Sequence, residues 1–263
     1  MIGLFLGGTD FPKLILEKLK KKNIEYFIID LTKKNLFKSY KNSYFISIGK
    51  FGKILKLLKD KKCEQVLFAG KIEKPNIANL KFDIKGLYYM PRIIKAFKLG
   101  DAAILKELII ILAENNIKVI KSNFFNPELS LNKGIYTKTK PNKKALYQIK
   151  SGIKSFQKLN AYDHTQAIIV NHNGSIFKET SKGTKKMIES INNNKNDYKI
   201  LIKFPKKKQD LRADLPTIGL DTLKDCKKAN LKGIVLKRNQ NIFLDQKKSI
   251  AFANKNNIFI YVL

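Results

Sequence analysis

The sequence has no tryptophan and only two cysteines and two histidines among its 263 residues. Cys63 and Cys226 lie far apart, without the close spacing of zinc ligands, so we interpret both as small apolar side chains. His164 and His172 have no partner at the spacing of a catalytic triad, and surface or hairpin positions explain both. The sequence therefore disfavours a zinc centre and catalysis by cysteine or histidine.

Long hydrophobic runs are also missing, since none approaches the roughly 18 to 20 residues that span a bilayer. Residues 1–8 lack the basic region and cleavage site of a signal peptide, and instead predict a first strand and turn. Apolar residues make up 44% of the chain and aromatic residues 10%, which is typical of a globular protein. We expect a cytoplasmic protein with one large domain or two modest ones.

Acidic residues are scarce. The chain has 21 Asp and Glu residues and 53 Lys and Arg residues, which gives a formal net charge of +32. Three of the cations are Arg, while Lys, Asn and Ile are abundant throughout, a bias typical of an AT-rich genome. Such a bias makes a chain basic whatever its function. The charge favours anionic ligands and surfaces by about 1 kcal/mol per well-placed Lys. A nucleic-acid-binding protein is an alternative, although the chain has no aromatic RNA-binding motif and no recognised nucleic-acid fold.

The first half of the chain alternates between strand and helix patterns. Short apolar runs predict strands at residues 2–6, 26–29, 44–48, 65–69 and 119–120. Helical spacing of apolar residues predicts helices at 11–22, 53–59, 91–97 and 101–113. Strands separated by helices form right-handed βαβ units, so we predict an α/β domain with a mainly parallel sheet over residues 1–128.

Residues 129–143 contain Gly134 and Pro141 among many Lys, Thr and Asn residues, which predicts a linker rather than a packed element. A second α/β domain is predicted over residues 144–263. Its expected helices are 144–159, 184–191 and 221–229, and its expected strands are 167–170, 175–179, 199–203, 233–236 and 258–262. The turn at residues 171–174 should join the first two of these strands as a hairpin.

Three short motifs follow predicted elements of the first domain. Gly7-Gly8-Thr9 and Gly70-Lys71 come after strands, at the edge where open parallel sheets bind ligands. Their N–H groups could approach a phosphate, or the glycines could simply form tight turns. Asp101 follows Gly100 at a helix start, where we predict a helix N-cap, with a ligand-facing carboxylate as the alternative.

The segment 203–219 is the most informative part of the sequence. Lysines at 203, 206, 207 and 208 precede Asp210, Arg212 and Asp214, which would project to one side of an extended chain. Two carboxylates with an Arg between them can hold Mg²⁺ and clamp a diphosphate. The use of Arg in a chain rich in Lys favours a planar, bidentate donor here. The alternative is an exposed edge strand with surface ion pairs, which contribute little.

The order and spacing of many short pieces resemble one known family over nearly the whole chain, the UDP-2,3-diacylglucosamine diphosphatases of the LpxI type. The pieces are Gly3-Leu4, Gly7-Gly8, Pro12, 49–53, 68–71, Lys74-Pro75, 98–101, Gln166-Ala167, Glu179, Gly183-Thr184, 203–219, Ala229 to Gly233 and Ile258 to Val262. The resemblance implies a Rossmann-like N-terminal domain and a C-terminal α/β catalytic domain. It also implies hydrolysis of UDP-2,3-diacylglucosamine to 2,3-diacylglucosamine 1-phosphate (lipid X) and UMP, in lipid A biosynthesis.

Within that family water attacks the α-phosphorus and Mg²⁺ is used. Carried onto this sequence, the resemblance makes Asp214 the essential aspartate and, with Asp210, the candidate metal ligand. The implied substrate-binding residues are Gly7, Gly8, Thr9, Gly70, Lys71, Lys74, Asp101, Gln166, Glu179, Gly183, Thr184, Lys206, Gln209 and Arg212. A lipid substrate implies peripheral contact with the inner membrane of a Gram-negative cell, and a homodimer is left open.

The chain departs from the family pattern in places. The family often has Glu-Gly-Thr-Asp where this chain has Lys182-Gly183-Thr184-Lys185, and the usual Asp-Ile-Gly-Gln is here residues 163–166, Asp-His-Thr-Gln. Thr9 replaces a third glycine of the opening turn. These changes keep a non-catalytic nucleotide-sugar binder open as an alternative.

Acyl chains need an apolar surface. Leu87, Tyr88, Tyr89 and Met90, beside Pro91, are candidates to line an acyl groove or to touch the membrane. Such residues more often belong to a protein core.

Overall fold

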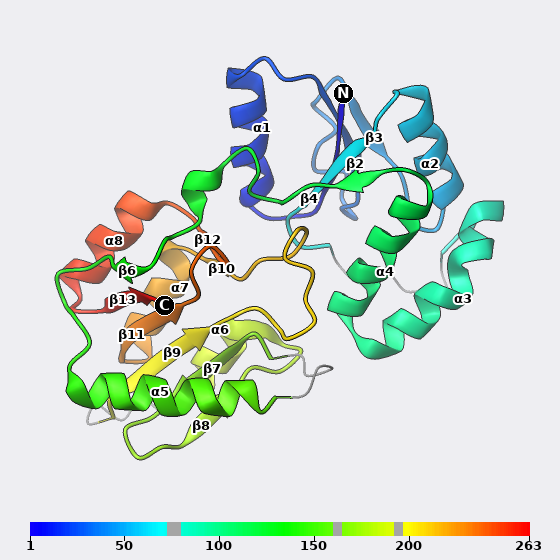
Figure 1. Ribbon diagram of the computed structural model, residues 1–263. Helices are drawn as coiled ribbons and strands as arrows, with labels where there is room; N and C mark the ends of the chain where they lie inside the picture. Colours follow the sequence, from blue (N-terminus) through cyan, green and yellow to red (C-terminus); the bar gives the residue numbers. More distant parts are fainter. Residues whose placement is uncertain (73–79, 160–164, 192–196) are drawn as a thin grey trace. The chain divides into compact units, whose positions relative to one another are not determined.

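The computed structural model describes residues 1–72, 80–159, 165–191 and 197–263 (Figure 1). The chain forms two compact units. The first comprises Met1–Pro127 together with Gln209–Asp214, and the second comprises Glu128–Lys208 and Leu215–Leu263. None of the helices in the described ranges is long and apolar enough to cross a membrane.

The first unit contains a five-stranded parallel sheet with the order β3-β2-β1-β4-β5. Its strands are β1 (Ile2–Leu6), β2 (Tyr26–Asp30), β3 (Ser43–Phe45), β4 (Gln65–Ala69) and β5 (Lys118–Val119). Its helices are α1 (Phe11–Lys21), α2 (Phe51–Asp60), α3 (Ile84–Leu99) and α4 (Asp101–Glu114). The strand order reverses between β1 and β4, which is the position where open α/β sheets bind ligands. The predicted parallel α/β architecture is confirmed.

Helix α3 begins at Ile84, whereas the sequence pattern placed its start near Pro91. The carboxylate of Asp83 caps the helix by accepting a hydrogen bond from the N–H of Gly86. Pro91 then lies inside the helix. The predicted start was therefore wrong, because this helix is already capped by Asp83 and continues through the proline.

The second unit contains a six-stranded mixed sheet with the order β6-β13-β11-β9-β7-β8. The strands are β6 (Gly134–Ile135), β7 (Ala167–Val170), β8 (Ile176–Lys178), β9 (Lys199–Lys203), β11 (Leu231–Leu236) and β13 (Phe259–Val262). β10 (Thr217–Ile218) and β12 (Ile242–Phe243) form a separate parallel pair. The helices are α5 (Lys143–Gln157), α6 (Gly183–Glu189), α7 (Leu220–Lys228) and α8 (Gln246–Lys255), with a 3₁₀ turn at Pro127–Leu129. The predicted hairpin is confirmed, because β7 and β8 pair antiparallel.

The segment expected to be a linker, residues 129–143, is instead packed into the second unit. β6 within it pairs antiparallel with β13. Leu131 is buried in the core, and its N–H donates to the side-chain oxygen of the buried Asn241. The composition of the segment predicted a linker. Its packing depends on main-chain pairing and on a distant Asn side chain, and neither can be recognised from the local residue types. The two-residue strands β10 and β12 were not predicted for the same reason. α8 was not predicted because its buried residues, Ser249 and Ala253, are small and give no strong apolar pattern.

Gly233 explains how β11 and β13 pack together. It lies directly opposite Phe259 in the register of the two strands. A Cβ added at Gly233 would lie 2.1 Å from Cζ of Phe259, and Phe259 is fully buried. The aromatic ring therefore occupies the space that the glycine leaves empty.

We expect Gly233→Ala to lower the free energy of unfolding by about 1–3 kcal/mol, because the buried ring must move in a close-packed core. Denaturant unfolding of the full chain measures this. The control is Gly219→Ala in the same unit, where an added Cβ would have only an ordinary contact 3.4 Å from Leu244. Equal losses in the two variants would contradict the packing role of Gly233.

Candidate functional site

The turn after β1 is locked by main-chain hydrogen bonds. The N–H of Gly7 donates to the carbonyl of Ala69 over 2.8 Å, and the N–H of Gly8 donates to the carbonyl of Lys71 over 2.9 Å. The N–H of Thr9 donates to Gly7 over 3.3 Å. These N–H groups, which were candidates to bind a phosphate, therefore donate to main-chain carbonyls of the first unit. The geometry fits a tight turn, and substrate contact through this turn stays a prediction.

Gly70 follows β4 and packs directly on the same turn. It has a φ of +84°, and an added Cβ would lie 2.7 Å from the carbonyl oxygen of Gly7. An added Cβ at Gly7 would in turn lie 2.4 Å from the carbonyl oxygen of Lys71. Both glycines are therefore required for the close approach of two loops at the point where the strand order reverses. The side chain of Lys71 is exposed beside them, and Lys74 lies outside the described residues.

Asp101 is the first residue of α4, and the N-cap position is occupied by Gly100 with a φ of +101°. The prediction of Asp101 as the N-cap was therefore wrong by one residue. Gly100 also ends α3, so a single glycine closes one helix and opens the next. The carboxylate of Asp101 still lies in the first turn of α4, where the helix dipole favours a negative charge.

Residues 209–214 form a compact turn rather than an extended strand. The carbonyl oxygen of Asp210 accepts hydrogen bonds from the N–H groups of Ala213 and Asp214, at 3.2 and 3.1 Å. The expectation that Asp210, Arg212 and Asp214 project to one side of an extended chain was therefore wrong. Local hydrogen bonds across three and four residues replace the alternation that a strand requires.

A bidentate ion pair closes this turn. The Nε and Nη2 atoms of Arg212 donate to the two carboxylate oxygens of Asp210, at 3.0 and 2.7 Å, and the N–H of Arg212 donates to the same carboxylate at 2.9 Å. The Arg212 hydrogen bond outweighs partial burial and holds the pKa of the Asp210 carboxyl below its usual range. Lys106 of α4 lowers the same pKa further. Asp210 is thus kept ionised and turned toward Arg212.

Main-chain contacts attach the turn to the first unit, although its sequence comes from the second half of the chain. The N–H of Ser122, which follows β5, donates to the carbonyl of Arg212 over 2.6 Å. Ala213 packs against the core of the first unit. The buried side chain of Gln209 donates to the carbonyl of Asp214 over 3.0 Å. Gln209, predicted to contact substrate, therefore also supports the backbone of Asp214.

The second unit brings three other predicted residues close to Glu179. Its buried carboxylate accepts from the N–H of Gln166 over 2.8 Å and from the hydroxyl of Thr184 over 2.6 Å. Gly183 has a φ of +87° at the start of α6, which a residue with a side chain would adopt only with strain. The sequence placed these residues 18 positions apart, and the end of the β7–β8 hairpin and the start of α6 bring them together.

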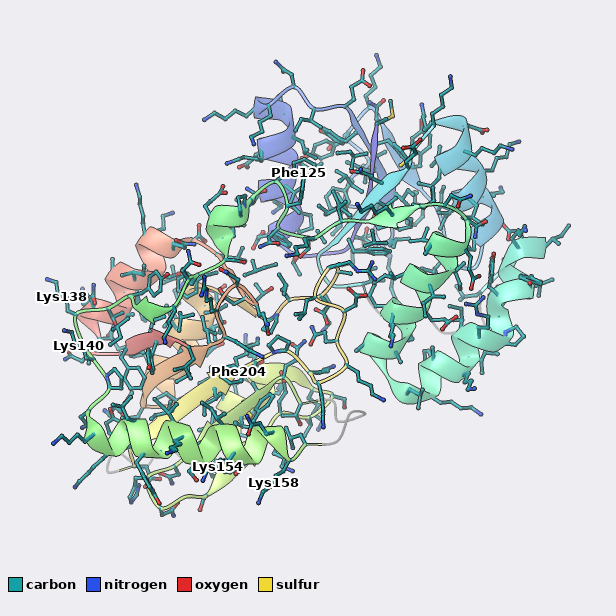
Figure 2. All side chains as sticks on the ribbon, viewed as in Figure 1. Phe125, Lys138, Lys140, Lys154, Lys158 and Phe204 are labelled. Carbon is teal, nitrogen blue, oxygen red and sulfur yellow. The ribbon has the colours of Figure 1, made fainter. Side chains whose placement is uncertain are left out.

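The lysines of the second unit differ in their positions. Lys182 and Lys185, where the family often has carboxylates, are exposed at the start of α6. Lys206 is half-buried in the loop after β9. Lys203 was grouped with it by sequence, but it is buried and its ammonium group donates to the carbonyl of Thr217 over 3.0 Å. Phe204, labelled in Figure 2, follows it and packs against Phe156 of α5.

Cysteine and histidine do not form a reactive centre in the described residues. Both cysteines are free and buried, and burial raises the pKa of the Cys226 thiol well above its usual range. His172 lies in the predicted hairpin turn, 3.5 Å from the carboxylate of Asp197, and His164 lies outside the described residues. The described ranges contain no group of three or more His, Cys, Asp or Glu side chains that could hold a metal ion. A protein-only metal cage of that kind is therefore absent from them.

Two residues important to this site have no signal in the sequence. Ser122 contributes a main-chain N–H, which any residue except proline could supply. Lys106 is one of many lysines, and only the fold places it near Asp210. Both contacts depend on the packing of the first unit.

Replacing Arg212 should raise the pKa of Asp210. In Arg212→Gln we expect the carboxyl titration to move up toward the ordinary value of about 3.9, because the principal donor to the charged form is lost. The ion pair stabilises the fold above the unfolded pKa of Asp210, and this contribution is lost as pH falls through its lower folded pKa. NMR titration of the Asp210 carboxyl carbon measures the shift, with Arg238→Gln as the control. An unchanged midpoint in Arg212→Gln would show that the ion pair does not form.

Removing the hydroxyl that binds Glu179 should destabilise the second unit. We expect Thr184→Val to reduce the free energy of unfolding by about 1–3 kcal/mol, because one oxygen of a buried carboxylate loses its donor. The matched control is Thr222→Val in α7, and denaturant unfolding compares the two. Indistinguishable midpoints would argue against the Thr184 hydrogen bond.

Comparison with known proteins assigns the chain to a family. A family model described as the LpxI N-terminal domain matches residues 1–129, and one described as the LpxI C-terminal domain matches residues 132–261. Among curated proteins, the UDP-2,3-diacylglucosamine pyrophosphatase LpxI of Caulobacter vibrioides is 27% identical over 223 residues, covering 82% of this chain and 80% of the relative. The chain therefore belongs to the LpxI family.

Proposed function

We propose that this protein hydrolyses UDP-2,3-diacylglucosamine to 2,3-diacylglucosamine 1-phosphate and UMP, a step of lipid A biosynthesis. The observation that carries the proposal is the match of both LpxI domains along nearly the whole chain. The turn formed by residues 209–214 supports it, because it places an ionised Asp210–Arg212 pair next to Asp214. Anion-binding and acidic groups in one short turn suit a reaction at a diphosphate.

Arg212 is the proposed phosphate-binding residue of this turn. Its side chain is 48% exposed, and two of its N–H groups are used by Asp210. A guanidinium has five N–H donors, so the others are available to phosphate oxygens without breaking the ion pair. Asp210 then acts mainly by orienting Arg212. The exposed Lys71, in the same unit, would help to neutralise the negative charge of the phosphates. Lys206 stays predicted as a substrate contact.

Asp214 is the proposed catalytic residue. Its backbone is fixed by the side chain of Gln209 and by the N–H bond to Asp210, which limits where its carboxylate can reach. In that position the carboxylate would orient the attacking water toward the α-phosphorus or hold a metal ion. Gly7, Gly8, Thr9, Gly70 and Asp101 stay predicted as substrate contacts, as do Gln166, Glu179, Gly183 and Thr184.

Mg²⁺ fits this site only together with the substrate. In enzymes that act on phosphates, this ion is usually bound by one or two carboxylates, with phosphate oxygens and water completing its shell. Asp214, with Asp210 as a second candidate, provides that minimal set, and the described residues provide no larger acidic group. When bound, Mg²⁺ would neutralise the diphosphate and polarise the phosphoryl oxygen.

The lipid substrate resides in a membrane, so we also propose peripheral contact with the inner membrane. The net charge of +32 supports attraction to an anionic surface. A homodimer stays open within this proposal.

Asp214→Asn should abolish turnover while leaving the fold intact. We expect UMP release from UDP-2,3-diacylglucosamine to fall by roughly 10³-fold or more, as when a group acting mainly in the transition state is removed. The control is Asp221→Asn, an exposed aspartate of α7 whose ion pair with Lys224 should contribute little. Removing Mg²⁺ with a chelator should stop the wild-type reaction, and adding it back should restore the rate.

Other outcomes would redirect the assignment. Full activity in Asp214→Asn would show that another group is catalytic. Tight substrate binding without UMP release by the wild type would identify a non-catalytic nucleotide-sugar binder, with Lys182 and Lys185 as the first residues to examine. Steeply salt-dependent binding to RNA or DNA, without hydrolysis, would favour the nucleic-acid-binding alternative.

A further inference from the structure

Helix α3 exposes large apolar side chains along one face. Ile84, Tyr88 and Leu87 are 86%, 70% and 59% exposed, and Ile94 is also exposed. Pro91 lies between them and is exposed as well. We call these five residues the α3 stripe. Their spacing, with steps of three and four residues, keeps them on one side of a helix.

The opposite side of α3 is already packed. Tyr89 is buried and its ring lies edge-on to Phe51 of α2, at 5.8 Å between centroids. Arg92 binds Glu107 and Glu114 of α4, at 2.6 and 2.8 Å. Of the residues considered for an acyl or membrane contact, Tyr89 thus belongs to the core, whereas Leu87 and Tyr88 face outward. The α3 stripe is therefore a second apolar surface on a helix whose core-facing side is filled.

The start of α3 is held firmly in place. Besides capping its own helix, the carboxylate of Asp83 accepts hydrogen bonds from the N–H groups of Gly52 and Lys53 at the start of α2, at 3.0 and 2.9 Å. Partial burial opposes these bonds, but together they keep the pKa of Asp83 below its usual range. The α3 stripe is thus presented on a fixed scaffold.

The charged residues of α3 itself are all cations. Lys85, Lys95 and Lys98 lie on the helix and are exposed, and the ammonium group of Lys85 lies 5.9 Å from the centre of the Tyr88 ring. No Asp or Glu occurs between residues 84 and 99. An apolar stripe flanked by lysines matches a surface helix that lies in the interface of an anionic bilayer.

We propose that α3 is the element through which this protein binds the surface of an anionic lipid bilayer, with the α3 stripe inserted and its lysines at the headgroups. The inference deepens the proposed function, because it names the surface that would bring a membrane-resident substrate to the enzyme. Charge decides against a second copy of the chain as the occupant. A two-fold contact places the same patch on both subunits, and here it would bring lysines against lysines.

Vesicle binding by the full chain tests the proposal. The probe is a flotation assay with vesicles of phosphatidylglycerol and phosphatidylethanolamine, compared with pure phosphatidylcholine. We expect the wild type to bind the anionic vesicles and to be released by salt. The triple variant Ile84→Gln, Leu87→Gln, Tyr88→Gln should bind them at least about tenfold more weakly, which corresponds to about 1.4 kcal/mol of lost binding free energy.

A matched control uses the exposed apolar residues of another basic helix. Leu146 and Tyr147 lie exposed on α5, which also carries Lys154 and is followed by Lys158 (Figure 2). Leu146→Gln, Tyr147→Gln should leave vesicle binding unchanged within about twofold. A third variant, with Lys85, Lys95 and Lys98 changed to Gln, should lose most of the preference for anionic over zwitterionic vesicles.

Several results would overturn the inference. These are a wild type that does not bind anionic vesicles, a triple variant that binds as well as the wild type, and equal losses in the triple and control variants. Dissociation of a dimer in the triple variant, seen by light scattering after size-exclusion chromatography, would assign the α3 stripe to a second copy. Circular dichroism verifies that the variants are folded.

The test also separates this inference from the proposed activity. With UDP-2,3-diacylglucosamine dissolved in detergent micelles, the triple variant should release UMP at the wild-type rate, because its catalytic turn is unchanged. With the substrate in anionic vesicles its rate should fall about tenfold, in line with its weaker binding. If the wild type releases no UMP but the triple variant still loses vesicle binding, the proposed activity fails and the membrane surface stands.

Discussion

The ion pair between Arg212 and Asp210 determines what the turn at residues 209–214 can do. The two carboxylate oxygens of Asp210 accept hydrogen bonds from Arg212, and these bonds fix the orientation of the guanidinium. Because Asp210 is bound to Arg212, the proposed function gives Asp210 mainly an orienting role and gives the catalytic role to Asp214. The proposed chemistry of the turn depends on this division of roles among three neighbouring residues.

The positions of the two glycine motifs were predicted correctly, but the structure gives another physical reason for a glycine there. Sequence reasoning placed Gly7 and Gly70 at the ends of parallel strands, and the strand order β3-β2-β1-β4-β5 confirms that both lie where that order reverses. The N–H groups of Gly7 and Gly8, however, donate to the backbone carbonyls of Ala69 and Lys71. The close approach of the two loops is sufficient to require both glycines. A sequence pattern cannot distinguish such packing from phosphate binding, because both require a missing side chain.

Sequence predicted most elements whose residues carry their own signal. Apolar runs such as 65–69 became buried strands, and the periodic pattern at 11–22 became α1. The failures share a physical origin. β6 depends on main-chain pairing with β13, and the turn at residues 209–214 depends on the N–H of Ser122, so their partners are distant in sequence and independent of side-chain type. The cluster around Glu179 was predicted in part. Its residues were predicted as substrate contacts, but the hydrogen bonds among them could not be predicted from the sequence.

Helix α4 connects the two surfaces proposed for the first unit. Gly100 joins α3 directly to α4, and Arg92 fixes the helices to each other through Glu107 and Glu114. Because its hydrogen bonds to those carboxylates outweigh burial, the pKa of Arg92 is raised above its usual value, so this link stays charged at any physiological pH. α4 in turn carries Lys106, which lowers the pKa of Asp210 in the turn at residues 209–214. A bilayer that holds α3 would therefore also hold α4, the helix that carries Lys106 next to the turn at residues 209–214.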